Sequence, residues 1–336
     1  MKFSEEKAYI GNLSQLFDVK EYRLSGGRQD GVRAVDICTG SGLELTVLPD
    51  RAMDLYQVKF GGKNLCYHTP SGIVAPAYYD KDGGQWLRSF YAGFLTTCGL
   101  TNIGSSCVDE GEALGCHGRI SSTPADRFAV IMGEKDGVPQ VTLQGVMNES
   151  VIFGHCQQLT RRITCTYGSS VIEIDDVVEN IGPRTTPHMI LYHFNMGYPL
   201  LSEKARYVIP SNQATARTEL ALNDIASWNR IDPPERDFEE RCYYHDIQAD
   251  AAGNAAVGID NPVENLSARI RYNKNELPYF VQWRMLGEGE YVTGLEPVNA
   301  PIAGRADARE RGELPFLAPG EKRHYHLEVE VGPCGE

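Results

Sequence analysis

Five short segments of this 336-residue chain combine histidine, carboxylate, amide or guanidinium side chains with glycine or aromatic residues. They cover residues 49–55, 98–102, 115–120, 192–199 and 292–299. A histidine or glutamate set between aromatic residues and glycines near strand ends can line a concave site. These side-chain types suit carbohydrate, because Arg, Asn, Asp and Gln bind hydroxyls and an aromatic face covers the C–H side of a sugar ring.

The elements that must position these segments are predicted to be strands. Apolar and polar residues alternate over 171–177, 266–272 and 325–331, as in half-buried strands. Residues 128–147 predict a hairpin, because two β-prone runs flank the turn-rich stretch 135–139.

Helical pattern is sparse, and the best candidates are short, at 85–94 and 221–225. The 34 glycines and 18 prolines mark frequent turns between short strands. Many short strands with little helix predict an all-β sandwich or barrel. No repeat or low-complexity linker divides the chain, so we expect a single domain over residues 1–336.

Composition narrows the function classes. The formal net charge of −13 disfavours binding to nucleic acid or to anionic membranes, because an acidic surface repels phosphate. The nine cysteines are odd in number and never spaced C-x-x-C, which removes the usual zinc and redox motifs. The N-terminal residues hold no apolar secretory segment, and no apolar run is long enough to span a bilayer. A cytoplasmic protein with reduced thiols is expected.

The order of several short motifs resembles the aldose 1-epimerase, or galactose mutarotase, superfamily. The resemblance is carried by Cys116-His117-Gly118, by the Tyr-His-Phe-Asn-Met run at 192–196, and by Gly294-Leu295-Glu296-Pro297. Tyr243-Tyr244-His245-Asp246 resembles the place where that family carries a substrate-binding aspartate. No single motif is specific, but their order and spacing match over most of the chain.

The resemblance is closer to an uncharacterised aldose-epimerase-like branch, marked by Arg-x-Met-Asp at 51–54, Cys-Gly-Leu-Thr-Asn at 98–102 and His-Gly-Arg-Ile at 117–120. It implies a large antiparallel β-supersandwich with few short helices, a substrate groove on one concave face, and no cofactor. The chain departs from the family pattern at Leu100-Thr101-Asn102-Ile103, where the family has a sugar-binding arginine. Arg51 or Arg119 is a candidate to replace it.

The resemblance implies a cofactor-independent isomerase that interconverts the anomers of a free monosaccharide. In this interpretation Glu296 is the catalytic base and His193 the catalytic acid, with His117 as a further hydrogen-bond donor. The side chains expected to orient sugar hydroxyls are Arg51, Asp54, Asn102, Arg119, Asn195, Asp246 and Gln282.

Each of these residues also has a structural interpretation. Glu296 can be a strand-end carboxylate in an ion pair, and His193 a hydrogen-bonded core histidine. Trp86, Trp228 and Trp283 are more often core residues than sugar platforms. We expect no metal site, because the histidines and Glu296 lack a local ligand spacing such as H-x-E.

Other functions stay open at this level. A non-catalytic carbohydrate-binding protein would need the groove but no acid and base. A sugar-phosphate epimerase would need a cluster of Arg or Lys at the groove rim, and Arg51 and Arg119 are the candidates there. A lyase or hydrolase is more remote. We expect a small-molecule sugar as the partner, and a homodimer is compatible with the sequence.

Overall fold

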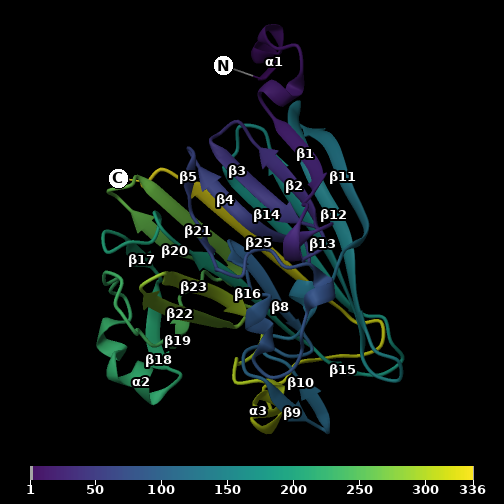
Figure 1. The fold of residues 1–336 in the computed structure, drawn as a ribbon, viewed down its shortest axis with the longest axis vertical. Helices are drawn as coiled ribbons and strands as arrows, with labels where there is room; N and C mark the ends of the chain where they lie inside the picture. Colours follow the sequence, from purple (N-terminus) through teal and green to yellow (C-terminus); the bar gives the residue numbers. More distant parts are fainter. Residues whose placement is uncertain (1–2, 336) are drawn as a thin grey trace.

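The computed structural model describes residues 3–335, and its strands form large antiparallel sheets (Figure 1). The eight-stranded sheet has the order β11 (Asp126–Lys135), β12 (Val138–Ser150), β13 (Cys156–Thr166), β14 (Val171–Asn180), β25 (Lys322–Gly332), β21 (Leu266–Asn273), β20 (Asn254–Asn261) and β17 (Arg206–Val208). The six-stranded sheet has the order β18 (Ser211–Ala216), β19 (Arg241–Ile247), β22 (Tyr279–Gly287), β23 (Glu290–Val298), β16 (Met189–Met196) and β8 (Leu95–Leu100). The five-stranded sheet has the order β1 (Asp18–Arg23), β2 (Arg33–Cys38), β3 (Leu43–Leu48), β4 (Asp54–Phe60) and β5 (Lys63–Asn64).

The remaining elements are short. Three strand pairs complete the β structure: β6 (Tyr67–His68) with β7 (Ala92–Gly93), β9 (Cys107–Asp109) with β10 (Glu112–Leu114), and β15 (Thr186–Pro187) with β24 (Phe316–Leu317). The α-helices are α1 (Phe3–Glu6), α2 (Glu219–Asn223) and α3 (Arg305–Glu310). Single 3₁₀ turns lie at Lys7–Tyr9, Leu13–Gln15, Gly27–Gln29, Pro76–Tyr78, Gln85–Arg88, Ile120–Ser122 and Ile225–Ser227. No helix among residues 3–335 has the length and apolar character needed to cross a membrane.

The predicted fold class is confirmed. Buried and more exposed positions alternate along β14, β21 and β25, as the sequence pattern predicts. The predicted hairpin is β11 and β12, joined at Asp136 and Gly137. Both turn residues have positive φ, as the favoured two-residue hairpin turns require.

The two helical predictions were only partly right. Within 85–94 only Gln85–Arg88 forms a 3₁₀ turn, because Ala92 and Gly93 leave the helical region to pair with β6. In the second region the helix begins earlier, at Glu219. The Thr218 side chain accepts a hydrogen bond from the Ala221 amide and so caps the start of the helix.

The last two strands of the six-stranded sheet, β16 and β8, break the alternation for a physical reason. All eight residues of β16 and all six of β8 are buried. Tyr192 and Phe194 pack in the large core that also holds side chains of the eight-stranded sheet. Met189 and Leu191 point to a second apolar cluster that includes Trp86. Both faces of β16 are therefore covered, and a polar residue there needs a partner or a function.

A buried charge cluster joins the three large sheets. Arg161 on β13 donates to both carboxylate oxygens of Asp176 on β14, at 2.9 and 2.7 Å. The same guanidinium donates to Asp54 Oδ1 on β4 at 2.7 Å and to Thr97 Oγ1 on β8 at 2.8 Å. From β16, the Tyr192 hydroxyl donates to Asp176 at 2.8 Å. This cluster fixes β4, β8 and β16 against the eight-stranded sheet.

Replacing Arg161 by Met should lower the free energy of unfolding by about 3–5 kcal/mol, because it leaves two buried carboxylates without their cation. Urea unfolding followed by fluorescence measures the change. The adjacent Arg162 is exposed, so Arg162→Met is a matched control that should cost less than about 0.5 kcal/mol. Equal losses in the two variants would show that the cluster does not hold the sheets together.

Candidate active site

Two strands of the six-stranded sheet bring His193 and Glu296 together. The antiparallel register of β16 and β23 pairs Phe194 with Leu295, and this sets His193 directly opposite Glu296. Directly opposed residues point to the same face of a sheet. His193 Nε2 lies 3.3 Å from Glu296 Oε1, and the two residues are only 5% and 2% exposed.

Gly294 makes room for this pair. A Cβ atom at position 294 would lie 2.3 Å from Glu296 Oε1 and 3.2 Å from His193 Cε1. Across the next strand Gly294 faces Trp283 on β22. The Trp283 ring meets the His193 ring edge-on, with centroids 5.4 Å apart. The empty side-chain position is thus filled by the carboxylate and the imidazole.

A loop supplies His117 to the same place. Its backbone has a φ of 55°, and its amide donates to the Gly104 carbonyl at 2.9 Å. The Gly104 amide in turn donates to His117 Nδ1 at 3.4 Å. Because Nδ1 accepts, the neutral ring carries its proton on Nε2. The His117 ring lies 5.7 Å from that of His193 and 4.7 Å from that of Trp86.

These side chains line a pocket with a volume of about 220 Å³. Its walls are Trp86, Leu87, Phe90, Gly104, Ser105, Cys116, His117, His193, Arg217, Glu240, Cys242, Trp283, Glu296 and Ile302. Three aromatic side chains and six polar ones of varied type suit a small polar ring compound. The interpretation of Trp86 and Trp283 as core residues was incomplete, because both also face this pocket.

Arg217 and Glu240 are pocket residues that the sequence analysis did not find. Arg217 Nη2 donates to Ser105 Oγ at 2.7 Å. Glu240 Oε2 accepts the indole N–H of Trp283 at 2.8 Å. Neither residue lies in a recognisable motif, and only the packing of β18 and β19 beside β22 brings them to the pocket.

The electrostatics of the pair are set by burial. Burial raises the pKa of Glu296 to about 8, with Glu240 adding to the rise and Arg217 opposing it. Burial lowers the pKa of His193 to about 3, with His117 contributing. Burial therefore favours an uncharged pair, with the proton that the two groups share on Glu296 and with His193 neutral. His193 Nδ1 and Glu296 Oε1 have no hydrogen-bond partner among residues 3–335, so a ligand can supply one.

Arg51 and Asp54 do not reach the pocket. The guanidinium of Arg51 is fully enclosed and donates to the carbonyls of Ser121, Val74 and Ser89. Asp54 is fully buried in the Arg161 cluster. Both are therefore left out of the site that we propose.

Three predicted side chains support the site from behind or beside it. Asn102 donates to the Ser105 and Gly115 carbonyls, at 3.0 and 2.8 Å, and so holds the loops that carry Ser105 and His117. Asn195 is buried beside Gly294 and donates to the His193 carbonyl at 2.8 Å. Gln282 is buried and lies 3.2 Å from His245 Nε2, away from the pocket lining.

Asp246 and Arg119 lie outside the pocket. Asp246 is exposed and pairs with Lys274 at 2.5 Å. Arg119 is exposed, and its guanidinium lies over the Tyr79 ring, 5.4 Å from the centroid. Within residues 3–335, no three or more His, Cys, Asp or Glu side chains are grouped so that they could hold a metal ion.

The model of a domain of unknown function, DUF4432, matches residues 29–331. The chain belongs to this family. No curated protein matches the sequence.

Solved structures place this DUF4432 chain among sugar epimerase-like folds. A Klebsiella pneumoniae protein provisionally described as an aldose 1-epimerase has a TM-score of 0.89 at 23% identity, over 95% of this chain and 84% of that one. A galactose mutarotase-like protein of Clostridium acetobutylicum has a TM-score of 0.66 at 12% identity, over 95% and 99%. Galactose 1-epimerase of Lactobacillus acidophilus has a TM-score of 0.60 at 11% identity, over 95% and 100%. The implied galactose mutarotase-like fold is confirmed.

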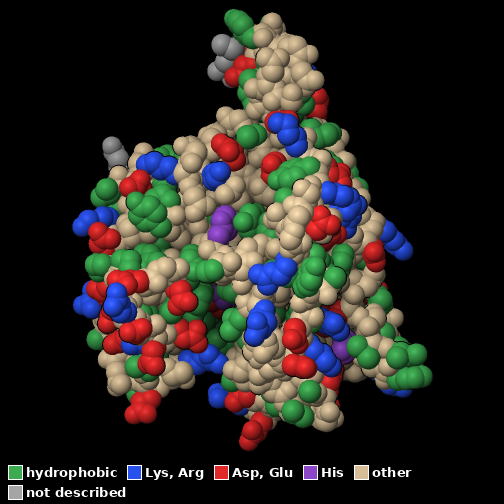
Figure 2. All heavy atoms as spheres, viewed as in Figure 1, with side chains coloured by type: hydrophobic (Ala, Val, Ile, Leu, Met, Phe, Trp, Pro, Cys, Tyr) green, Lys and Arg blue, Asp and Glu red, His purple; other side chains and the backbone are tan. Residues whose placement is uncertain are grey.

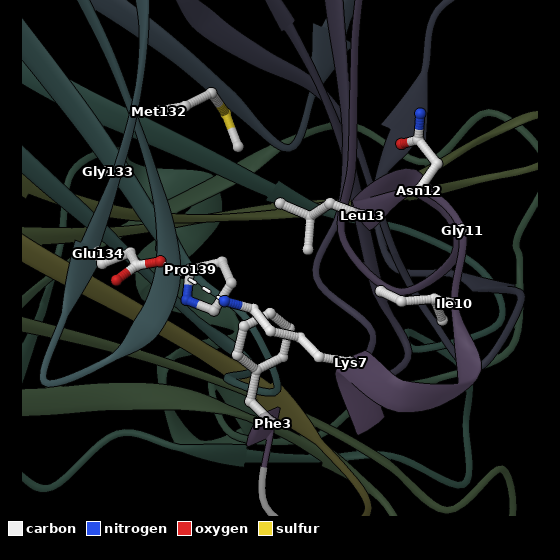
Figure 3. Close-up of a pocket in the computed structure, with 10 residues that line it drawn as sticks. All are labelled: Phe3, Lys7, Ile10, Gly11, Asn12, Leu13, Met132, Gly133, Glu134 and Pro139. Carbon is white, nitrogen blue, oxygen red and sulfur yellow. Dashed lines mark ion pairs between the residues drawn. The ribbon is translucent and has the colours of Figure 1, made fainter. Parts of the chain in front are cut away.

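The DUF4432 chain has a larger hollow elsewhere, between its N-terminal arm and the β11–β12 hairpin (Figure 3). Its volume is about 540 Å³, and Phe3, Leu13 and Met132 lie along it. Among residues 3–335, the charged groups in it are Lys7 and Glu134, 4.0 Å apart and both exposed. No histidine of residues 3–335 lines it, whereas His193 and Glu296 line the smaller pocket.

Glu296→Gln should stabilise the DUF4432 fold, and more so at alkaline pH. The folded-state pKa of about 8 lies above the unfolded value, so folding costs free energy that grows as pH rises from about 4.5 to 8. The gain in the free energy of unfolding should be on the order of a few kcal/mol above pH 8 and small at pH 5. Melting temperatures at both pH values measure it, with exposed Glu290→Gln on the same strand as the control. A gain in stability that does not depend on pH would refute a raised pKa for the buried Glu296 carboxyl.

Proposed function

We propose that this protein is an aldose 1-epimerase-like isomerase that interconverts the anomers of a free, uncharged monosaccharide. The single observation that supports this most is the buried Glu296–His193 pair, 3.3 Å apart, at the floor of an aromatic-walled pocket. Anomer exchange needs one proton acceptor and one proton donor beside a neutral ring. A pair that holds one proton supplies both roles.

In the proposed reaction Glu296, as carboxylate, takes the proton of the anomeric hydroxyl. The electron pair of that O–H bond forms the aldehyde C=O, the C1–O5 bond breaks, and O5 takes a proton from His193. Rotation about C1–C2 exposes the other aldehyde face, and the reverse steps close the ring. Burial favours protonated Glu296 and neutral His193. The proton must therefore move from Glu296 to His193 before the ring opens.

The remaining pocket residues are proposed to bind the sugar. Trp86, Phe90 and Trp283 present aromatic surface to its C–H face. Arg217 supplies the guanidinium for which Arg51 and Arg119 were candidates, since it alone of the three lines the pocket. His117 Nε2–H is a donor for the ring oxygen or a neighbouring hydroxyl.

The charges in the pocket favour an uncharged sugar over a sugar phosphate. Among residues 3–335, Arg217 is the only guanidinium or ammonium group in the lining, and Glu240 offsets its charge. Two or more cations would be expected around a phosphate. A non-catalytic sugar-binding protein is the second candidate, and it is disfavoured because binding alone has no use for a costly buried carboxyl.

Glu296→Gln should slow anomer exchange by about 10²–10⁴-fold, because it removes the base and keeps the side-chain size. Two-dimensional NMR exchange on a panel of aldoses measures the rate, and calorimetry measures sugar binding, which should persist. Glu290→Gln is again the matched control. Unchanged exchange in the Glu296 variant would remove the proposed mechanism.

The pH profile reports whether the Glu296–His193 pair must hold its one proton to act. Because the proposed reaction uses that proton on His193, kcat/KM, corrected for spontaneous exchange, should be level below about pH 8 and fall above it, where the pair loses the proton. Glu240→Gln should move this fall to lower pH, because the Glu240 charge raises the Glu296 pKa. Glu239→Gln, at the neighbouring exposed position, should not. A profile that rises through pH 8 would show that the pair acts without its proton, and would rule out His193 as the acid.

A further inference from the structure

A second hollow lies on the same face of the six-stranded sheet as the active pocket. Its volume is about 600 Å³, and it runs along Thr215, Tyr244 and Tyr279, with Pro301 and Ala303 on one side. Arg217 lines both this hollow and the active pocket. The two spaces are therefore neighbours.

The strand register shows that the two spaces share one surface. Thr215 on β18 pairs with Tyr244 on β19, and Val281 on β22 pairs with Glu296 on β23. Tyr244 also pairs with Val281, so these residues form one row across four strands, all on one face. Tyr244 lies two strands from Glu296, or about 10 Å at the usual strand spacing. That distance exceeds the reach of a single sugar ring bound at Glu296.

The segment after β23 lies between the two spaces and contributes to both. Ile302 lines the active pocket, while Pro301 and Ala303 line the second hollow. Its position is fixed, because the Ile302 amide donates to the Tyr244 hydroxyl at 3.1 Å and the Ile302 carbonyl accepts the Ser105 amide at 3.1 Å.

The chemistry of the second hollow resembles that of the first. The phenol rings of Tyr244 and Tyr279 are half-buried and offer aromatic surface. Hydroxyl, carboxylate and guanidinium groups surround them, at Thr215, Thr218, Arg217, Asp307, Arg311 and Glu313. Such a mixture suits the hydroxyls of a carbohydrate better than an apolar group.

We propose that the second hollow is a subsite for a second sugar ring, and that the substrate is a reducing disaccharide or a similarly substituted aldose. This rests on the proposed function, because anomer exchange requires a free hydroxyl at C1 of the ring in the active pocket. The second ring must then be joined through another carbon of that ring. The active pocket of about 220 Å³ falls below the usual range of about 300–1,000 Å³ for ligand sites, so it has room for one ring only.

NMR exchange on lactose, maltose, cellobiose and melibiose, beside glucose and galactose, tests the subsite. At least one disaccharide should have a kcat/KM 10-fold or more above that of the monosaccharide at its reducing end. Tyr279→Ala should remove most of this advantage and leave monosaccharide exchange within twofold. Thr215→Trp, on the exposed edge strand, should do the same by filling the hollow. Tyr22→Ala, on the distant β1, is the matched control.

Calorimetric binding of the same sugars to Glu296→Gln separates this proposal from the proposed reaction. Tighter binding of a disaccharide, lost in Glu296→Gln/Thr215→Trp, supports the subsite even if no sugar exchanges its anomers. Equal affinities and equal rates for monosaccharides and disaccharides would overturn the subsite and leave the proposed reaction standing. The subsite would also be overturned if Tyr279→Ala and Thr215→Trp changed kcat/KM equally for monosaccharides and disaccharides.

Discussion

One buried guanidinium determines how the sheets of this molecule meet. Arg161 comes from the eight-stranded sheet and binds Asp54 of the five-stranded sheet and Thr97 of the six-stranded sheet. Buried charges persist only where partners compensate for lost hydration, so these positions are coupled. Tyr192 joins the cluster through Asp176, and successive strand residues point to opposite faces. His193 is therefore held in place from the opposite face of β16.

The sequence predicts the fold better than it predicts the site. Strands such as β14 and β25 have one covered and one open face, so their alternation is plain. In β16 both faces are covered, and the lost alternation drew attention to His193, which lines the pocket. The same signal was misleading at Arg51 and Asp54. These residues are buried because they bind other groups in the protein interior. Their partners come from Ser121 and Arg161, far along the chain, and sequence spacing cannot distinguish such burial from ligand binding.

Arg217 and Glu240 show the opposite failure. Arg217 lies at the end of an edge strand and Glu240 just before the next strand, in stretches with no motif. On the face drawn in Figure 2, acidic and basic side chains are interspersed, so charge pattern does not single them out. Only the order of β18, β19 and β22 in the sheet carries them to Trp283 and Ser105. That order results from long-range pairing, which local sequence does not encode.

Glu296 and His193 keep their positions because the surrounding side chains restrict their movement. An uncharged carboxyl buried without an aligned partner costs free energy, and side-chain movement would normally relieve that cost. Here Trp283 and His117 pack against the imidazole, and the carboxylate lies beside Gly294. Gly294 gives the pair just the volume that it occupies. In the proposed function, a sugar hydroxyl in the pocket supplies hydrogen bonds to this pair, so part of the cost of folding returns as binding free energy at the atoms proposed to react.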